Sequence, residues 1–346
     1  MITEIRAGKK NLITDVTGIR VGNAEDSSVI SGVTVIYPEN PVTASCFCAG
    51  GGPGTRETDL LDPRATVNEI NALTFSGGSA FGLQAGGAVA DELKKSGEGF
   101  RINKDLAIPI VPGAVLFDFL NGGDKSRADG ELYAALAKKA LKNAGKDFNL
   151  GNAGAGLGAK AGNIKGGLGS ASSVISTVKG TVTVGALAAV NSYGSVLFPG
   201  EPTFLSGWCS MPEDGLPAFK PESGQFSEKW IWEKSLDFFS ENSSTTLCLI
   251  ATDAALTKAE CARVAQSAVA GLARAIRPVM TSMDGDIIFV ISTNKVPFIG
   301  GAYELSILAN YASDCLSRAI MRGVHCAGSI PKFESWKEKF GKADAK

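Results

Sequence analysis

Two long apolar runs in the last third of the chain, each leading into a helical pattern, restrict the fold most. One run covers residues 247–252 (LCLIAT) and the other covers 286–293 (DIIFVIST). Runs of this kind are typical of strands buried on both faces. Apolar residues then recur with helical spacing over 257–277 and over 303–321. A strand without a polar face needs a layer on either side. The sequence therefore predicts an α/β fold in which helices cover a sheet on both faces or two sheets stack.

Local signals predict the remaining elements. Thr257 and Glu260 have the spacing of a capping box, in which a hydroxyl and a carboxylate satisfy free N–H groups at a helix start. Pro278 is expected to end that helix. Residues 200–243 are the least periodic part of the chain and are expected to form a surface excursion or linker. Further strands or buried elements are predicted within 13–36, 44–52, 111–120 and 170–198, and further helices within 81–95 and 131–144.

Histidine is almost absent, which excludes several kinds of chemistry. The 346 residues include one histidine, His325. Zinc enzymes usually use two or three imidazole ligands, and a Ser-His-Asp arrangement would have to use this one residue. Cys46 and Cys48 have no second pair to complete a zinc site. We therefore expect no metal, and a catalytic base other than imidazole.

Charge and cysteine content restrict the partners and the compartment. Lys and Arg number 34, Asp and Glu number 35, and no basic stripe is present, so nucleic acid is not an expected partner. No apolar stretch approaches the ~18–20 residues that cross a bilayer, so no membrane partner is expected. The first residues have no apolar core of a signal peptide, and the seven cysteines contain no C-x-x-C pair. These features predict a cytoplasmic protein.

Four consecutive hydroxyl side chains, residues 243–246, precede the first buried strand. Their ordinary interpretation is a Ser/Thr turn. The alternative is that Thr245 is a nucleophile that works without histidine. An N-terminal threonine has its own α-amine, with a pKa of ~7.7–8, to act as the base. This requires cleavage of the preceding peptide bond, which the Thr245 hydroxyl itself is suited to attack from a strained turn.

Three polar residues fit this hypothesis. Asp284 and Asp286 flank Gly285 at the start of the second buried strand, and residues two apart in an extended chain face the same side. Both carboxylates are expected to orient the new amine or a substrate ammonium, although a D-G-D turn with solvated carboxylates is the simpler alternative. Asn191 follows a long apolar run and is a candidate oxyanion donor through its side-chain amide.

Glycine is abundant, with 42 residues, and concentrates in two segments. The segment 151–167 contains a dinucleotide-binding look-alike at Gly156, Gly158 and Ala161. No strand leads into it and no Asp or Glu occurs from residue 149 to 200, so we expect no NAD and no other cofactor. These glycines either present N–H groups to an anion or allow two strands to cross closely. The segment GGSAFGL (77–83) places Ser79 at a helix start, where it is suited to line a pocket.

The segments GGSAFGL, GNAGAG…KGGLGSAS, AAVNSYG, TTLCLIATDA and MDGDIIF together resemble the L-aminopeptidase/D-esterase family, whose relatives include β-peptidyl aminopeptidases and nylon-oligomer hydrolases. They occur in family order from about residue 10 to residue 325. The resemblance implies a four-layer αββα sandwich of the N-terminal-nucleophile-hydrolase type, forming one structural domain over 1–330. It also implies self-cleavage into an α chain, 1–244, and a β chain, 245–346, which assemble into homo-oligomers, most often tetramers.

The resemblance also assigns roles to individual residues. It implies cleavage between Ser244 and Thr245, catalysis by Thr245 with Asp284 and Asp286, and an oxyanion contact from Asn191. The implied catalytic lysine is Lys165. The implied pocket residues are Gly78, Ser79, Phe117 and Gly156.

Three positions depart from the family pattern. Ser244 replaces the usual Asn or Gly, so the bond between Asn242 and Ser243 is a second candidate for cleavage. Phe117 replaces a tyrosine. The family lysine aligns without a gap to Asn163, with Lys160 and Lys165 as neighbours.

The sequence therefore predicts a self-processing amide hydrolase, an aminopeptidase acting on small peptides, amides or esters. A hydrolase of 6-aminohexanoate oligomers or other ω-amino-acid amides is the alternative among enzymes. An unprocessed binding or structural relative is the alternative outside enzymes.

Overall fold

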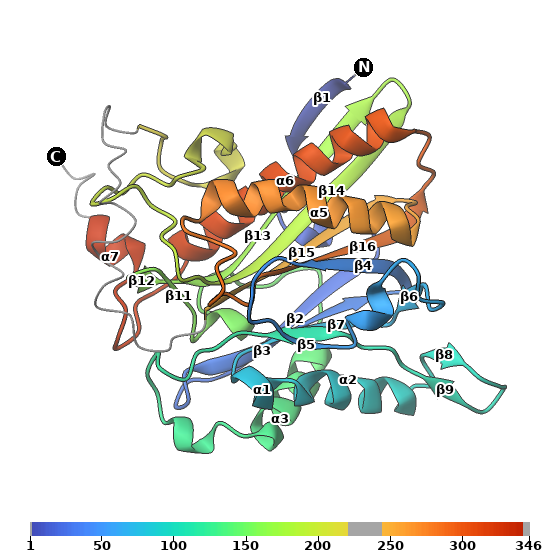
Figure 1. Cartoon of the computed structure of the whole chain (residues 1–346), viewed down its shortest axis with the longest axis horizontal. Coiled ribbons are helices and arrows are strands. Elements are labelled where there is room, and N and C mark those ends of the chain that lie inside the picture. The colour runs from blue at the N-terminus through green and yellow to red at the C-terminus, as the bar shows by residue number, and fades with distance from the viewer. Residues whose placement is uncertain (1, 221–243, 342–346) are drawn as a thin grey trace.

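Helices and strands form four layers in the structure, a computed structural model that describes residues 2–220 and 244–341 (Figure 1). Two stacked sheets lie in the middle, and a pair of helices covers the outer face of each. The expected four-layer αββα sandwich is thus confirmed. Within the described residues, no helix combines the length and the apolar character that crossing a bilayer requires.

The larger sheet carries the two apolar runs at its centre. Its seven strands follow the order β1-β13-β14-β15-β16-β4-β6, and β15 pairs antiparallel with β14 and parallel with β16. Both faces of β15 and of the first six residues of β16 are buried because layers lie above and below them, as their lack of a polar face required. The strands are β1 (Ile2–Ala7), β13 (Gly167–Thr177), β14 (Gly180–Asn191), β15 (Thr245–Ala254), β16 (Ile287–Val296), β4 (Val42–Cys48) and β6 (Glu69–Ile70).

The smaller sheet has five strands in the order β2-β3-β7-β10-β5. These are β2 (Ile19–Asp26), β3 (Ser31–Pro38), β7 (Leu73–Ser76), β10 (Gly113–Val115) and β5 (Gly54–Arg56). Two further two-stranded pieces are β8 (Phe100–Arg101) with β9 (Ala107–Ile108), and β11 (Lys160–Ala161) with β12 (Ile164–Lys165).

The helices bury one face each against a sheet. α5 (Lys258–Ala275) and α6 (Ala302–His325) cover the larger sheet, and α2 (Gln84–Lys95) and α3 (Gly130–Lys142) cover the smaller one (Figure 1). α1 (Ser79–Gly82) and α7 (Trp336–Phe340) are short. The expected capping box starts α5, because the Thr257 side chain accepts from the Glu260 N–H and the Glu260 carboxylate accepts from the Thr257 N–H.

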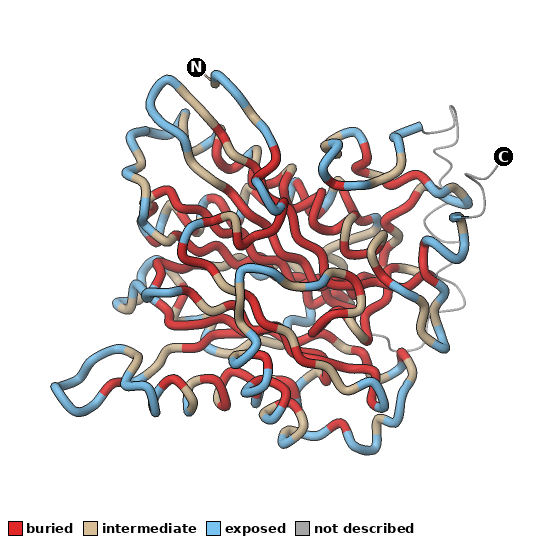
Figure 2. Tube along the Cα trace, turned by 180° about the vertical axis from the view of Figure 1, so that it is seen from behind, coloured by how far each residue is buried: buried red, intermediate tan, exposed pale blue. Residues whose placement is uncertain are grey.

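The core between the sheets is built by apolar side chains from both layers. Figure 2 shows that the buried residues concentrate in these middle layers. Phe75 of the smaller sheet lies against Phe289 of the larger one, with ring centroids 6.1 Å apart. Each fully buried side chain of this size contributes roughly 1.5–3 kcal/mol. The packing of this core fixes the positions of β15 and β16, and therefore of the residues with which these strands begin.

Two local expectations need correction. The segment 111–120 is largely buried, as expected, but only the three residues of β10 form a strand and the rest is loop. Residues 201–220 are not merely a surface excursion: Asp214 is buried and forms an ion pair with Arg318 of α6, with an N–O distance of 2.8 Å. A buried charge requires such a partner, and this pair fixes the segment to the helix layer.

Candidate active site

Thr245 is the first residue of β15 and lies between the ends of two neighbouring strands. Asn191, the last residue of β14, pairs directly with it, and the parallel register with β16 places Gly285 beside it. Thr245 is 4% exposed. Side chains alternate along a strand, so Thr245 shares a face with Leu247, and Asn191 shares one with Ala189. Both apolar residues belong to the core between the sheets. The Thr245 hydroxyl and the Asn191 amide therefore face the same inter-sheet space.

Gly285 contacts both the Thr245 side chain and the preceding peptide group. Its N–H donates a hydrogen bond of 2.7 Å to the carbonyl oxygen of Ser244, the residue before the expected cleavage point. A Cβ at Gly285 would lie 2.6 Å from Thr245 Oγ1, closer than any real side chain approaches. Only glycine leaves room for the hydroxyl here, and its N–H is aimed at the carbonyl that the hydroxyl would attack.

Asp286 is bound to backbone groups around Thr245. Its two carboxylate oxygens accept from the N–H of Thr246 at 2.7 Å and from the N–H of Met280 at 3.0 Å. Burial and the neighbouring Asp284 raise the pKa of Asp286 to about 7. The carboxylate is therefore held one residue from the Thr245 nitrogen and titrates near neutral pH.

Asp284 lies on the other side of Gly285 and is also buried. It accepts from the N–H of Thr281 at 2.9 Å and from the Thr281 hydroxyl at 2.6 Å. Burial raises its pKa, and the charge of Lys160 partly offsets this shift. The two carboxylates are not solvated groups of a surface turn, so the simpler interpretation of the D-G-D segment is wrong.

The raised pKa of Asp286 makes folding stability depend on pH. The unfolded carboxyl titrates near its ordinary value of 3.8 and the folded one near 7, so the folded state holds the extra proton between these values. The stability from this group is present below about pH 4 and is lost as the pH rises through 7. Asp286→Asn removes the effect. We expect the free energy of unfolding in urea to shift in favour of the variant by about 2 kcal/mol or more between pH 5 and pH 8, from the ~1.4 kcal/mol per pKa unit. A pH-independent difference between the two proteins would contradict this assignment.

Asn191 is held by three neighbours. Its Oδ1 accepts from Asn121 Nδ2 and from the Lys160 N–H, each at 3.1 Å, and its Nδ2 donates to the Phe117 carbonyl at 3.0 Å. These bonds fix which end of the amide is the donor. An amide nitrogen has two N–H groups, and the bond to Phe117 uses one of them, so the second is left to donate to an oxyanion.

The residues after β10 connect Asn191 to the expected pocket loop. Phe117 accepts from Asn191, and the next residue, Asp118, accepts from the Gly78 N–H at 3.0 Å. The Ser79 N–H donates to the Leu116 carbonyl at 3.0 Å, and Ser79 has a positive φ of 48°. A Cβ at Gly78 would lie 2.0 Å from the Tyr133 ring. Hydrogen bonds thus gather three of the four expected pocket residues, Gly78, Ser79 and Phe117, beside the end of β14.

The two candidate lysines differ in their surroundings. Lys165 is fully buried and its ammonium donates to the carbonyls of Gly156 and Gly166 at 2.8 and 2.7 Å. Burial lowers the pKa of Lys165 to about 7, and the carboxylate that acts on it is Asp118. Burial also lowers the pKa of Lys160, but there the acting carboxylate is Asp284. The Lys160 backbone N–H also donates to Asn191 Oδ1, so Lys160 is the lysine that contacts the group around Thr245.

The glycine-rich segment packs against backbone. Residues 154–156 form a single 3-10 turn, and the short strands β11 and β12 follow it rather than a helix. A Cβ at Gly156 would lie 2.2 Å from the Leu168 nitrogen, and one at Gly167 would lie 2.4 Å from the Gly323 carbonyl. Of the two interpretations left open, close crossing of backbones is the one that the contacts favour.

His325 takes no part in this region. It lies at the end of α6 against the rings of Trp336 and Phe204, and burial lowers its pKa to about 4. Among the described residues, no group of three or more His, Cys, Asp or Glu side chains is placed to hold a metal ion.

Asn121 and Asp118 were missed from the sequence. Asn121 holds Asn191 and also donates to the Gly158 carbonyl at 2.7 Å, and Asp118 joins Gly78 to the hydroxyl of Ser31. An Asn before two glycines has the pattern of an ordinary turn, so no local signal marks either residue. The bond between Asn242 and Ser243, the second candidate cleavage site, lies outside the described residues.

The fold and this group of residues define an αββα hydrolase, and comparisons with known proteins identify its family. The model of Peptidase family S58 matches residues 11–337. An uncharacterized aminopeptidase of Mycobacterium tuberculosis is 38% identical over 349 residues, covering 95% of this chain and 98% of the relative. A 6-aminohexanoate-oligomer endohydrolase of Paenarthrobacter ureafaciens is 25% identical, covering 84% and 77%.

A solved structure agrees in fold. The L-aminopeptidase D-Ala-esterase/amidase from Ochrobactrum anthropi, described as a variant of the Ntn-hydrolase fold, has a TM-score of 0.70 with 21% identity, covering 97% of this chain and 96% of that one. The chain belongs to Peptidase family S58. It is a hydrolase of peptide or amide bonds.

Proposed function

We propose that this hydrolase cleaves itself before Thr245 and then uses Thr245 as an N-terminal nucleophile. The observation that carries the proposal is the hydrogen bond from the Gly285 N–H to the Ser244 carbonyl, beside the Thr245 hydroxyl. This N–H polarises the carbonyl in the precursor and holds the charge that develops on its oxygen.

Self-cleavage requires only groups already in place. The Thr245 oxygen adds to the Ser244 carbonyl carbon, the peptide C–N bond breaks, and the hydroxyl proton ends on the freed nitrogen. Water then hydrolyses the resulting ester to give a Ser244 carboxylate, the Thr245 hydroxyl and a free Thr245 amine. The products are an α chain, 1–244, and a β chain, 245–346.

Turnover repeats this chemistry on a substrate. The free amine of Thr245 takes the hydroxyl proton as the oxygen attacks the substrate carbonyl. The Asn191 amide faces the same space and is suited to hold the oxyanion, while Asp286, bound to the next N–H, and Asp284 orient the amine. We place Lys160 in this group, rather than the Lys165 that the family resemblance implied, because the Lys160 N–H donates to Asn191 Oδ1. Water then releases the acyl group.

The substrate class we propose is a small peptide or amide with a free amino end, cleaved by an aminopeptidase. The full-length similarity to a protein named aminopeptidase favours it, and two buried carboxylates beside the nucleophile are suited to a cationic amine. A hydrolase of ω-amino-acid oligomers is the second candidate. The 6-aminohexanoate-oligomer endohydrolase is the relative that favours it.

A comparison of substrates separates these candidates. We expect leucine p-nitroanilide to be cleaved at least tenfold faster, in kcat/KM, than a 6-aminohexanoate dimer. N-acetylation should lower the rate on the anilide at least tenfold because it removes the ammonium. Equal rates on free and acetylated anilide would contradict the aminopeptidase proposal, and faster cleavage of the dimer would favour the second candidate. An unprocessed binding protein would cleave neither.

We also propose a cytoplasmic location. We further propose that the cleaved units assemble into a homo-oligomer, specifically a tetramer. All seven cysteines lie in the described part of the chain and are free, which suits a reducing compartment. Assembly rests on the family resemblance. Size-exclusion chromatography with light scattering tests it directly.

A further inference from the structure

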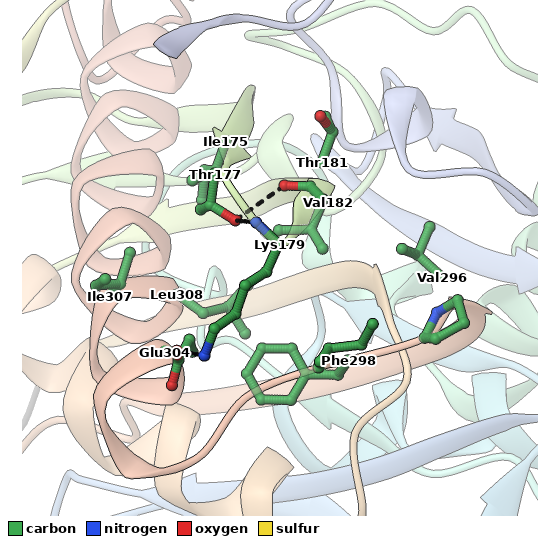
Figure 3. A pocket seen from close by; sticks show the side chains of 13 residues that line it. Ile175, Thr177, Lys179, Thr181, Val182, Val296, Phe298, Glu304, Ile307 and Leu308 are labelled. Atoms are coloured by element: carbon green, nitrogen blue, oxygen red, sulfur yellow. Dashed lines mark hydrogen bonds and ion pairs between the residues drawn. The ribbon is translucent and has the colours of Figure 1, made fainter. Parts of the chain in front are cut away.

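A pocket lies at the end of the larger sheet opposite Thr245. Figure 3 shows its lining from close by. The turn between β13 and β14, the residues after β16 and the first turns of α6 form it. Thr181, in its lining, and Asn191 are ten residues apart on β14, which corresponds to roughly 33 Å at ~3.3 Å per residue. The pocket has a volume of about 190 Å³ and is separate from the candidate active site.

The interior of this distal pocket is apolar. Ile175 and Leu308 form its buried part, at 1% and 2% exposed, and Val182 and Phe298 line it further out. Figure 3 shows these side chains around the cavity. An apolar cavity of about 150 Å³ takes a molecule the size of benzene. The distal pocket is therefore suited to an aliphatic chain of about six carbon atoms.

One ion pair supplies the polar chemistry at this pocket. Lys179, from the β13–β14 turn, is bound to Glu304 in the first turn of α6. The Thr177 hydroxyl is occupied within the turn, where it donates to the Gly180 carbonyl at 3.1 Å. The Thr181 hydroxyl donates to Ser176. The pair is therefore the polar group that a ligand meets.

Each partner of the pair keeps capacity for a further hydrogen bond. A lysine ammonium has three N–H donors, and a carboxylate has several acceptor positions, of which one receives the Gly301 N–H at 2.9 Å. The hydrogen bond from Lys179 lowers the pKa of Glu304 to about 2, so the pair is ionised at neutral pH. A donor and an acceptor thus lie side by side with no net charge.

We propose that the distal pocket binds a short unbranched aliphatic amide, with its chain between Ile175 and Leu308 and its amide group on the Lys179–Glu304 pair. The amide carbonyl accepts from the Lys179 ammonium while the amide N–H donates to Glu304. A carboxylate end would meet the Glu304 charge, and an ammonium end would meet the Lys179 charge. A neutral amide satisfies both partners without separating them. This site does not depend on the proposed catalytic function.

Calorimetric titration with three six-carbon probes tests the head group. We expect hexanamide to bind at least tenfold more tightly than hexanoate or hexylammonium. Ile307→Trp, which places a large side chain on the half-buried lining of the pocket, should weaken hexanamide binding at least tenfold. Val178→Trp is the control, because Val178 is 69% exposed on the same turn and does not line the pocket. It should leave the affinity unchanged.

A charge change gives a second, independent test. Glu304→Gln keeps the side-chain acceptor for the Gly301 N–H and removes the negative charge. The variant should bind hexanoate more tightly than the unchanged protein does, by at least tenfold. The proposal is overturned if wild-type protein binds no hexanamide up to its solubility. It is also overturned if hexanoate is the tightest probe of the wild type, if Ile307→Trp binds hexanamide normally, or if Glu304→Gln leaves the order of the three probes unaltered.

Discussion

Thr245→Ala is expected to lower kcat/KM for any amide substrate by at least ~10⁴-fold, the loss typical of removing a catalytic nucleophile. Thr245 is buried at the start of β15, and the residue beside it is Gly285, which has no side chain to replace the lost hydroxyl. Thr245→Ser keeps the oxygen and should retain activity within roughly tenfold of the wild type, since it loses only a methyl group.

The neighbouring threonine is the matched control for this experiment. The Thr246 hydroxyl is buried, and it lies on the face of β15 opposite that of the Thr245 hydroxyl. Thr246→Val preserves the shape of the side chain and should leave activity within about threefold of the wild type. Activity that persists in Thr245→Ala but disappears in Thr246→Val would move the nucleophile by one residue and contradict the assignment.

The second large effect is expected from Gly285→Ala. The added Cβ would lie 2.6 Å from Thr245 Oγ1 and 2.8 Å from the Gly52 carbonyl, so one of these groups must move. A displacement of about 1 Å at a reacting atom costs on the order of 100-fold in rate. We expect both self-cleavage and turnover to fall by at least this factor. Single-turnover assays and the time course of precursor loss measure the two steps.

Gly301→Ala is the control for this substitution. A Cβ at Gly301 would have nothing within 4 Å, and neither glycine has a positive φ, so the two variants differ mainly in the collision with the Thr245 hydroxyl. Gly301→Ala should behave as wild type. If Gly285→Ala retained full cleavage and turnover, the close contact between Gly285 and the Thr245 hydroxyl would have no catalytic consequence.

The parts of the fold that the sequence revealed are those with a strong local signal. The capping box at Thr257 and the apolar run from residue 247 correctly located α5 and β15. α6 extends to His325, beyond the expected end near Met321, because its last turns remain buried against the sheet. β10 has only three residues because its loop turns away to support Asn191. The burial of Asp214 depends on Arg318, which lies 104 residues away, so no local pattern reveals it.

The residues of the candidate site also fall into those with a local sequence signal and those without one. The proposed nucleophile Thr245, the two carboxylates and Asn191 stood out in the sequence because each adjoins an apolar strand. Their neighbours did not. Asn121 reaches Asn191 across 70 residues, and the difference between the two lysines is that the Lys160 N–H donates to Asn191 whereas the Lys165 ammonium donates to two carbonyl groups. Such contacts follow from the stacking of two sheets, which sequence spacing does not encode.

The central claim is that the chain cleaves itself before Thr245, and the intact mass of freshly purified protein tests it most directly. Two fragments corresponding to residues 1–244 and 245–346, replaced by one full-length chain in Thr245→Ala, are the expected result. A single uncut chain in both samples would contradict self-processing. A cut after Asn242 would contradict the assignment to Thr245 and give the nucleophile role to Ser243.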